Sequence, residues 1–173
     1  MLRLIFVSLL LVAVKSDSKI DEILGSWEQI AIYPNYFAAT EDCTPYNFTV
    51  NEGLKCTCDG VETPVVNVHN SKEGSVDIPV TFVDNYEEVV PKLNATCSCN
   101  GEFLTHSLIR KINTDYLICY AKYVDSDVPV YVTEVMARKL EKLSEVQAVL
   151  NNLPELRGKE LSYLCENGSP SEG

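Results

Sequence analysis

The stretch that decides the fold is Asp21-Glu22-Ile23-Leu24-Gly25-Ser26-Trp27-Glu28-Gln29-Ile30-Ala31-Ile32-Tyr33-Pro34. It contains the only tryptophan of the chain, and a side chain of this size is costly to leave in water, so we expect Trp27 to face a core. Gly25 permits a tight turn into a strand. Pro34 ends that strand, because proline has no amide proton to donate to a neighbouring strand. We therefore predict a buried strand that begins near Trp27 and ends at Tyr33.

The segment before this strand has the pattern of a secretory signal peptide. One basic residue, Arg3, precedes an apolar block over Leu4–Val14, which is too short for a stable membrane anchor and has no polar face. Cleavage is expected after Ser16, which leaves residues 17–173 as one domain. We therefore expect a secreted, extracellular protein.

Charge and composition exclude some partners. The chain has 14 Lys plus Arg against 25 Asp plus Glu, a formal net charge of −11, and phosphate binding requires a basic face, so no nucleic-acid partner is expected. No second apolar run of membrane length follows the first, so we expect no membrane span. Asn47, Asn94 and Asn167 each begin an Asn-x-Ser/Thr sequon, which predicts surface glycosylation sites in a secreted chain.

The body of the chain reads as short strands between turns. Asp59-Gly60 and Asn100-Gly101 are strong hairpin signals, and eight to nine strand-like segments lie between Trp27 and Met136. They include Val76 to Val83, Lys92 to Cys99 and Glu102 to Ile112. One amphipathic helix is predicted at about 138–151, ended by Asn152 and Pro154 and followed by a tail over 152–173. This order predicts an all-β barrel or sandwich with one late helix.

Three motifs, in order along the chain, resemble those of the lipocalin family in the calycin superfamily. Gly25-Ser26-Trp27 is similar to its first signature, and the strand that follows resembles the insect bilin-binding protein and apolipoprotein D branch. Thr114-Asp115-Tyr116 resembles the signature of a turn at the closed end, and Arg138 matches the basic residue that lies over the signature Trp. The resemblance implies an eight-stranded antiparallel up-and-down barrel with one C-terminal helix outside it. It also implies that Gly25, Trp27, Thr114, Asp115 and Arg138 close the barrel floor.

Seven cysteines constrain this interpretation. The resemblance implies a bridge between Cys43 and Cys165 that ties the tail to the barrel. Cys56, Cys58, Cys97 and Cys99 form two Cys-x-Cys pairs, each just before a hairpin turn. Disulfides are favoured for them over a four-thiolate zinc site, because the expected compartment is oxidising and Cys-x-Cys is not the usual zinc spacing, so no metal is expected. Cys119 is the expected odd thiol.

The resemblance implies a ligand inside the barrel, which an eight-stranded barrel can hold. We expect secretion and transport of a small hydrophobic molecule such as a bilin pigment, retinoid, fatty acid, sterol or pheromone, with a tetrapyrrole pigment or lipid in place of any cofactor. The alternative is an effector or matrix protein that contacts other proteins, or a scavenger of amines or haem. Aromatic residues in strands or at the mouth are the predicted ligand contacts: Tyr33, Tyr36, Phe37, Phe82, Phe103, Tyr116, Tyr120 and Tyr131.

No enzyme is expected. His69 and His106 are the only histidines, and neither lies in a recognisable nucleophile motif with a serine or cysteine. A barrel cysteine such as Cys56 or Cys97 would resemble the one that prostaglandin synthases of this fold use, but no base is placed to activate it.

Overall fold

The computed structural model describes residues 18–35, 43, 45–125, 128–139 and 143–165. Within them, one large sheet curls into a closed barrel because its first strand pairs with its last. The barrel strands are β1 (Gly25–Tyr33), β2 (Pro45–Val50), β5 (Val65–Asn70), β6 (Gly74–Phe82), β9 (Ser107–Lys111), β10 (Tyr116–Asp125) and β11 (Val128–Ala137). A two-residue strand, β12 (Ser162–Tyr163), pairs with the outer end of β1. The predicted all-β barrel is confirmed, with seven strands rather than eight closing it.

The barrel departs from a simple up-and-down order at one place. Strand β6 pairs with β9 in parallel, Val80 against Ser107 and Phe82 against Ile109, whereas the other pairs described in this sheet are antiparallel. The chain between these two strands therefore leaves the barrel wall. It forms a one-turn helix η2 (Tyr86–Glu88), the helix α2 (Val89–Leu93) and then part of a second sheet.

The predicted strand from Lys92 to Cys99 is wrong in its first half, where the structure has helix α2. Asn85 accepts a hydrogen bond from the backbone nitrogen of Glu88 at 3.2 Å, and its amide donates to the Glu88 carboxylate at 2.8 Å. This reciprocal pair is a helix-start signal of the Asn-x-x-Glu type. A Glu88–Lys92 ion pair one turn apart adds to it. Local capping therefore replaces a barrel strand with a helix.

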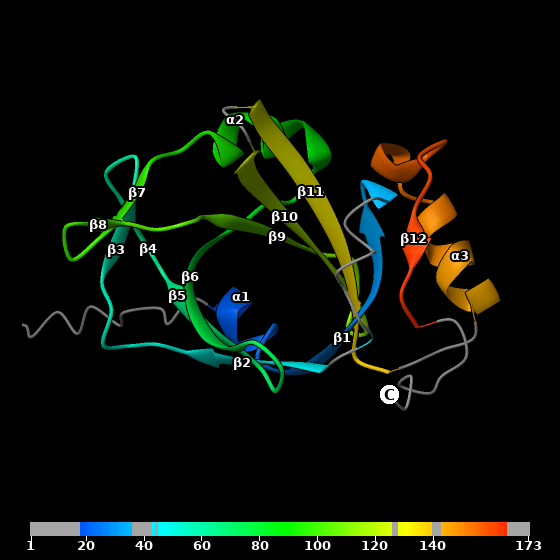
Figure 1. The fold of residues 1–173 in the computed structure, drawn as a ribbon, viewed down its shortest axis with the longest axis horizontal. Coiled ribbons are helices and arrows are strands. Elements are labelled where there is room, and N and C mark those ends of the chain that lie inside the picture. The colour runs from blue at the N-terminus through cyan, green and yellow to red at the C-terminus, as the bar shows by residue number, and fades with distance from the viewer. Residues whose placement is uncertain (1–17, 36–42, 44, 126–127, 140–142, 166–173) are drawn as a thin grey trace, which may run out of the picture.

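The second sheet lies beside the barrel and contains the Cys-x-Cys pairs. Its strands, in spatial order, are β4 (Val61–Thr63), β3 (Cys56–Cys58), β7 (Cys97–Cys99) and β8 (Glu102–Phe103). Asp59 and Asn100 adopt positive φ, as the two-residue hairpin turns predicted at these positions require. Figure 1 shows this small sheet on one side of the barrel and the C-terminal helix on the opposite side.

Two short helical segments flank the barrel wall. Helix α1 (Ser18–Asp21) precedes β1, and α3 (Leu143–Asn151) packs on the outside of the barrel, followed by a one-turn helix η3 (Pro154–Leu156). The predicted outer helix is confirmed, although β11 extends to Ala137 and residues 138–139 are not helical; the start predicted near residue 138 lies partly outside the described residues. Among the described helices, none is long and apolar enough to cross a membrane.

The barrel wall separates two hydrophobic clusters, and β10 shows how. Leu117 and Cys119 point inward with Trp27, whereas Ile118 and Tyr120 point outward and pack under α3 and η3. Because a strand alternates its side chains, each face of β10 contributes to a different core. Both faces are apolar, so this strand carries no polar stripe that marks its outer side.

Candidate functional site: the barrel cavity and its floor

The floor of the barrel is closed by Trp27 and Arg138. The Arg138 guanidinium carbon lies 4.0 Å from the centre of the fully buried Trp27 ring, and its Nη2 donates to the carbonyl oxygens of Glu22 and Leu24, each at 3.0 Å. The indole Nε1 donates to the Ile23 carbonyl at 2.7 Å. The guanidinium therefore joins an aromatic face to backbone oxygens that precede β1.

Gly25 and the Asp115 turn complete this floor. Gly25 has φ of +96°, and a Cβ there would lie 3.4 Å from Nη1 of Arg138. The Arg138 backbone nitrogen donates to the Asp115 carbonyl at 3.0 Å. The turn around Thr114 and Asp115 is held by Asn113, whose side-chain oxygen accepts from the nitrogens of Asp115 at 2.8 Å and Tyr116 at 2.9 Å. Residues from both ends of the chain thus meet at one end of the barrel.

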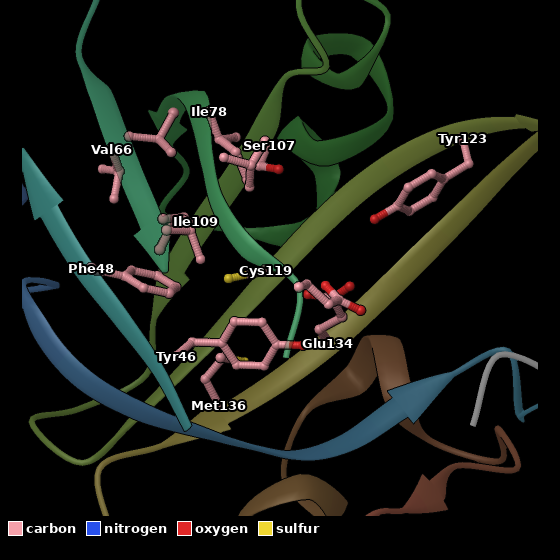
Figure 2. A pocket seen from close by; sticks show the side chains of 14 residues that line it. Tyr46, Phe48, Val66, Ile78, Ser107, Ile109, Cys119, Tyr123, Glu134 and Met136 are labelled. Carbon is pink, nitrogen blue, oxygen red and sulfur yellow. The ribbon is translucent and has the colours of Figure 1, made fainter. Parts of the chain in front are cut away.

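Above the floor the barrel encloses a cavity of about 170 Å³. Most of its wall is apolar, and Figure 2 shows these side chains converging from β2, β5, β6, β9 and β11. The apolar residues that line it are Phe48, Val66, Val68, Val76, Ile78, Val80, Ile109 and Met136. This is the composition expected of a site for a small, mostly apolar ligand.

A few polar groups lie on the same wall. They are Tyr46, Glu73, Ser107, Cys119, Tyr123 and Glu134. Glu134 is half-buried, and Figure 2 shows the Tyr46 ring extending toward it across the cavity. The Tyr46 hydroxyl also donates to the side-chain oxygen of buried Gln29 at 3.3 Å. The cavity therefore combines an apolar wall with a carboxylate and phenolic hydroxyls at one side.

Cys119 faces Glu134 across the β10–β11 pair and is the cysteine outside any bridge. Burial raises the pKa of the Cys119 thiol well above its ordinary value, and the negative charge of Glu134 raises that pKa further. The thiol is therefore protonated at neutral pH and is a poor nucleophile. Cys119 is therefore better suited to contact a ligand than to react with it covalently.

None of the predicted aromatic contacts that the structure describes lines this cavity. Tyr116 and Tyr120 are buried in the outer cluster, and Phe103 is 76% exposed on β8. The other described members of the set are Tyr33, which lies under the Lys159 amine at 4.6 Å, Phe82, which packs against the inner cluster, and exposed Tyr131, whose hydroxyl lies 3.5 Å from Asn94. Tyr36 and Phe37 lie outside the described residues.

The orientation of Tyr116 and Tyr120 could not be predicted because strand alternation leaves one choice open, and a slip of one residue exchanges inside for outside. On β10 these two tyrosines pack in the outer cluster with residues of α3, whereas Tyr123 on the same strand lines the cavity. The missed contacts include Tyr46 and Phe48 on β2 and Glu134 on β11. Glu134 carried a usable signal, because it is the single charged residue in the run Val130 to Ala137.

A buried ion pair lies outside the barrel and fastens the chain after α3. Arg110 on β9 pairs with Glu155 of η3, and the Tyr120 hydroxyl donates to the same carboxylate oxygen at 3.1 Å. Burial, together with the Glu155 charge, raises the pKa of Tyr120, so its hydroxyl remains a donor. Tyr120 is therefore a structural residue of the outer core.

All seven cysteines are described, and six form bridges. Cys43 pairs with Cys165, which ties the start of β2 to the segment after β12 across 122 residues. Cys56 pairs with Cys99 and Cys58 with Cys97, each between directly opposed residues of β3 and β7. These two bridges therefore join β3 to β7 within the small sheet and do not link that sheet to the barrel.

Two of the three sequons are described. Asn47 is exposed on the outer face of β2. Asn94 follows α2, where its amide donates to the Val90 carbonyl at 3.0 Å and its side-chain oxygen accepts from Lys122 at 2.9 Å. Asn167 lies outside the described residues. Both described side chains lie at the surface.

The fold is that of the lipocalins: a closed β-barrel, antiparallel except for the β6–β9 pair, with a Trp–Arg floor and an outer C-terminal helix. Solved structures similar to this chain include apocrustacyanin C2 (12% identity, 90% of this chain and 84% of that one, TM-score 0.46). Another is the siderocalin Ex-FABP (11% identity, 88% of this chain and 95% of that one, TM-score 0.45). A third is lobster apocrustacyanin A1 (12% identity, 87% of this chain and 81% of that one, TM-score 0.43). No family model matches the sequence, and no curated protein matches it. At such identities the fold assignment rests on the strand pairing of this chain.

Proposed function

We propose that the protein is a secreted binding protein that captures a small amphiphilic ligand, one aromatic or aliphatic ring with a short cationic amine tail, in the barrel cavity. The observation that carries this proposal is the half-buried Glu134 carboxylate on the mostly apolar wall of the cavity. A carboxylate in such surroundings favours a cation, because a charge-assisted hydrogen bond is strong where water is excluded. The formal net charge of −11 also attracts cations to the molecule.

The size of the cavity narrows the ligand class. A cavity of about 150 Å³ admits a benzene ring in an otherwise packed core, and the present cavity of about 170 Å³ is only slightly larger. One ring with a short tail fits this space. A bilin, a retinoid or a sterol is much larger than this space. We therefore do not propose a pigment as the ligand, although β1 resembles the first strand of the bilin-binding branch. An amine scavenger fits the geometry better than a pigment carrier.

Secretion is part of the same proposal. The apolar block of residues 1–16 is read as a signal peptide, and three disulfides are characteristic of an oxidising compartment. Glycosylation at Asn47 and Asn94 would face solvent in this fold. The role is binding rather than catalysis, because the cavity thiol of Cys119 is kept protonated.

The Glu134→Gln substitution is expected to weaken phenethylamine binding by at least about tenfold. It removes the charge and keeps the shape, and a hydrogen bond to a charged group contributes about 1.5 to 3 kcal/mol. Isothermal titration calorimetry with phenethylamine and the neutral phenethyl alcohol measures both affinities. The affinity for the alcohol should change by less than about threefold, since it does not depend on the carboxylate charge.

Glu73→Gln is the matched control, because Glu73 also borders the cavity but is exposed in the β5–β6 turn. It should change phenethylamine affinity by less than about threefold, since an exposed charge is screened. Thermal unfolding of each variant checks that it is folded. Equal affinity of the unchanged protein for the amine and the alcohol, or an unaffected Glu134→Gln variant, would contradict the proposal.

A further inference from the structure

A histidine beside the second sheet lies close to one of the disulfides of that sheet. Cys58 on β3 and Cys97 on β7 are directly opposed and bridged, with their Cα atoms 4.0 Å apart. A ring nitrogen of His106, which immediately precedes β9, lies within 4.8 Å of both sulfur atoms. Three atoms that bind soft and borderline metals are thus gathered from β3, from β7 and from the residue before β9.

His106 has an unused ring nitrogen at this place. The residue is only 7% exposed, and its Nε2 lies 2.9 Å from the Thr81 hydroxyl. Nδ1 is buried and has no hydrogen-bond partner among the described residues. A buried polar atom without a partner is destabilising, because it has lost its hydrogen bond to water. In a neutral imidazole one of the two ring nitrogens carries a lone pair, and this lone pair is what binds a metal.

We propose that reduction of the Cys58–Cys97 bridge creates a zinc site formed by the two thiolates and the His106 imidazole. The reductant is a dithiol. One of its sulfurs attacks the bridge, which releases one cysteine and forms a mixed disulfide with the other. The second sulfur of the dithiol then attacks this mixed disulfide and releases the other cysteine. The dithiol leaves as a disulfide, and Cys58 and Cys97 gain two electrons and two protons. Binding of Zn²⁺ then releases the two thiol protons to solvent. A water molecule completes the four-coordinate Cys₂His set.

The neighbouring contacts preserve the geometry after reduction. Cys56–Cys99 lies two residues along the same strands and keeps β3 and β7 in register. The Asp59 nitrogen donates to the Thr96 carbonyl at 3.0 Å, and the Thr96 nitrogen donates to the Asp59 carboxylate at 2.9 Å. Zn–S bonds of about 2.3 Å at a tetrahedral angle place two sulfurs about 3.8 Å apart. Rotation of the two side chains reaches that separation while the strands stay in place.

The bridge is buried, but its residues border two clefts. Cys58 and His106 both line a cleft of about 620 Å³ between the small sheet, β6 and α2. Cys97 and His106 line a second cleft of about 280 Å³ on another side. The bridge between Cys43 and Cys165 is different: its sulfurs lie near the Glu28 carboxylate, with no histidine in the group. The two clefts are the route by which we expect a reductant and a cation to approach the buried Cys58–Cys97 bridge.

The test uses the full disulfide-bonded chain under anaerobic conditions. Graded dithiothreitol treatment followed by differential alkylation and mass spectrometry finds the condition at which Cys58 and Cys97 are free and Cys56 and Cys99 are still bridged. After removal of dithiothreitol, Co²⁺ serves as a spectroscopic probe and Zn²⁺ as its competitor. We expect one Co²⁺ per chain, with thiolate charge-transfer and tetrahedral visible bands that one equivalent of Zn²⁺ removes, and no such bands in the oxidised protein.

Variants assign the ligands. His106→Gln should weaken Co²⁺ and Zn²⁺ binding at least about tenfold, and Cys58→Ser with Cys97→Ser should abolish the charge-transfer band. His69→Gln is the matched control, because His69 is exposed and bonds Ser75 on the barrel. It should leave both affinities unchanged. Absence of the bands, equal affinity in His106→Gln, or unfolding on reduction of Cys58–Cys97 alone, seen by circular dichroism, would each overturn the proposal.

Discussion

Replacing Trp27 with alanine is expected to lower the free energy of unfolding by about 3 to 5 kcal/mol, the range for truncating a large buried aromatic residue. Trp27 is fully buried at the barrel floor, where it contacts the inner cluster on one side and the Arg138 guanidinium on the other. The substitution opens a void and leaves the Ile23 carbonyl without its indole donor. Urea denaturation followed by far-ultraviolet circular dichroism measures the change.

Phe103→Ala is the control for this truncation, because Phe103 is 76% exposed on β8. It should change the free energy of unfolding by less than about 0.5 kcal/mol, as is usual for surface positions. If Trp27→Ala costs no more than the control, the floor does not stabilise the barrel and the account of the closed end is wrong.

Removing the Cys43–Cys165 bridge by replacing both residues with alanine is expected to cost about 4 to 5 kcal/mol. The bridge spans 122 residues, and in the chain-entropy model a loop near this length contributes that much by restricting the unfolded chain. The same bridge holds the segment of β12 against β1. Denaturation of the double variant under non-reducing conditions gives the difference from the unchanged protein.

The paired control is the Cys56→Ala, Cys99→Ala variant. Its loop of 43 residues encloses the 39-residue loop of Cys58–Cys97, so the inner bridge still closes almost the same segment when the outer one is removed. The entropic loss should therefore be small, below about 1.5 kcal/mol. A cost for Cys43–Cys165 no greater than for this control would show that the long loop adds no stability.

The barrel could be predicted from the sequence because its floor depends on residue types with few alternatives. The motifs are a lone Trp after a glycine, a Thr-Asp turn and an arginine after the last strand. Together they span more than 100 positions, yet the structure brings Trp27, Asp115 and Arg138 into one network. The hairpin turns at Asp59 and Asn100 could also be predicted, because few residue types readily adopt the positive φ that these turns require.

The cavity lining could not be predicted, because both faces of the key strands are apolar. On β10, Cys119 faces the cavity and Tyr120 faces the outer cluster, and only the position of α3 decides between them. Helix α2, which lies where the first half of the strand Lys92 to Cys99 was predicted, was missed for a different reason: the Asn85–Glu88 spacing is a short local signal, and the structure shows that both of its hydrogen bonds form.

The most direct test of the proposed function is a methyl nuclear magnetic resonance titration of the protein labelled at methionine. Met136 is the one methionine in residues 17–173, and its buried side chain lines the cavity beside Glu134 (Figure 2). We predict that phenethylamine shifts its methyl resonance saturably, with the affinity found by calorimetry, and that Glu134→Gln weakens this shift in parallel. Binding heat from the amine without any movement of the Met136 resonance would place the ligand elsewhere and contradict the account.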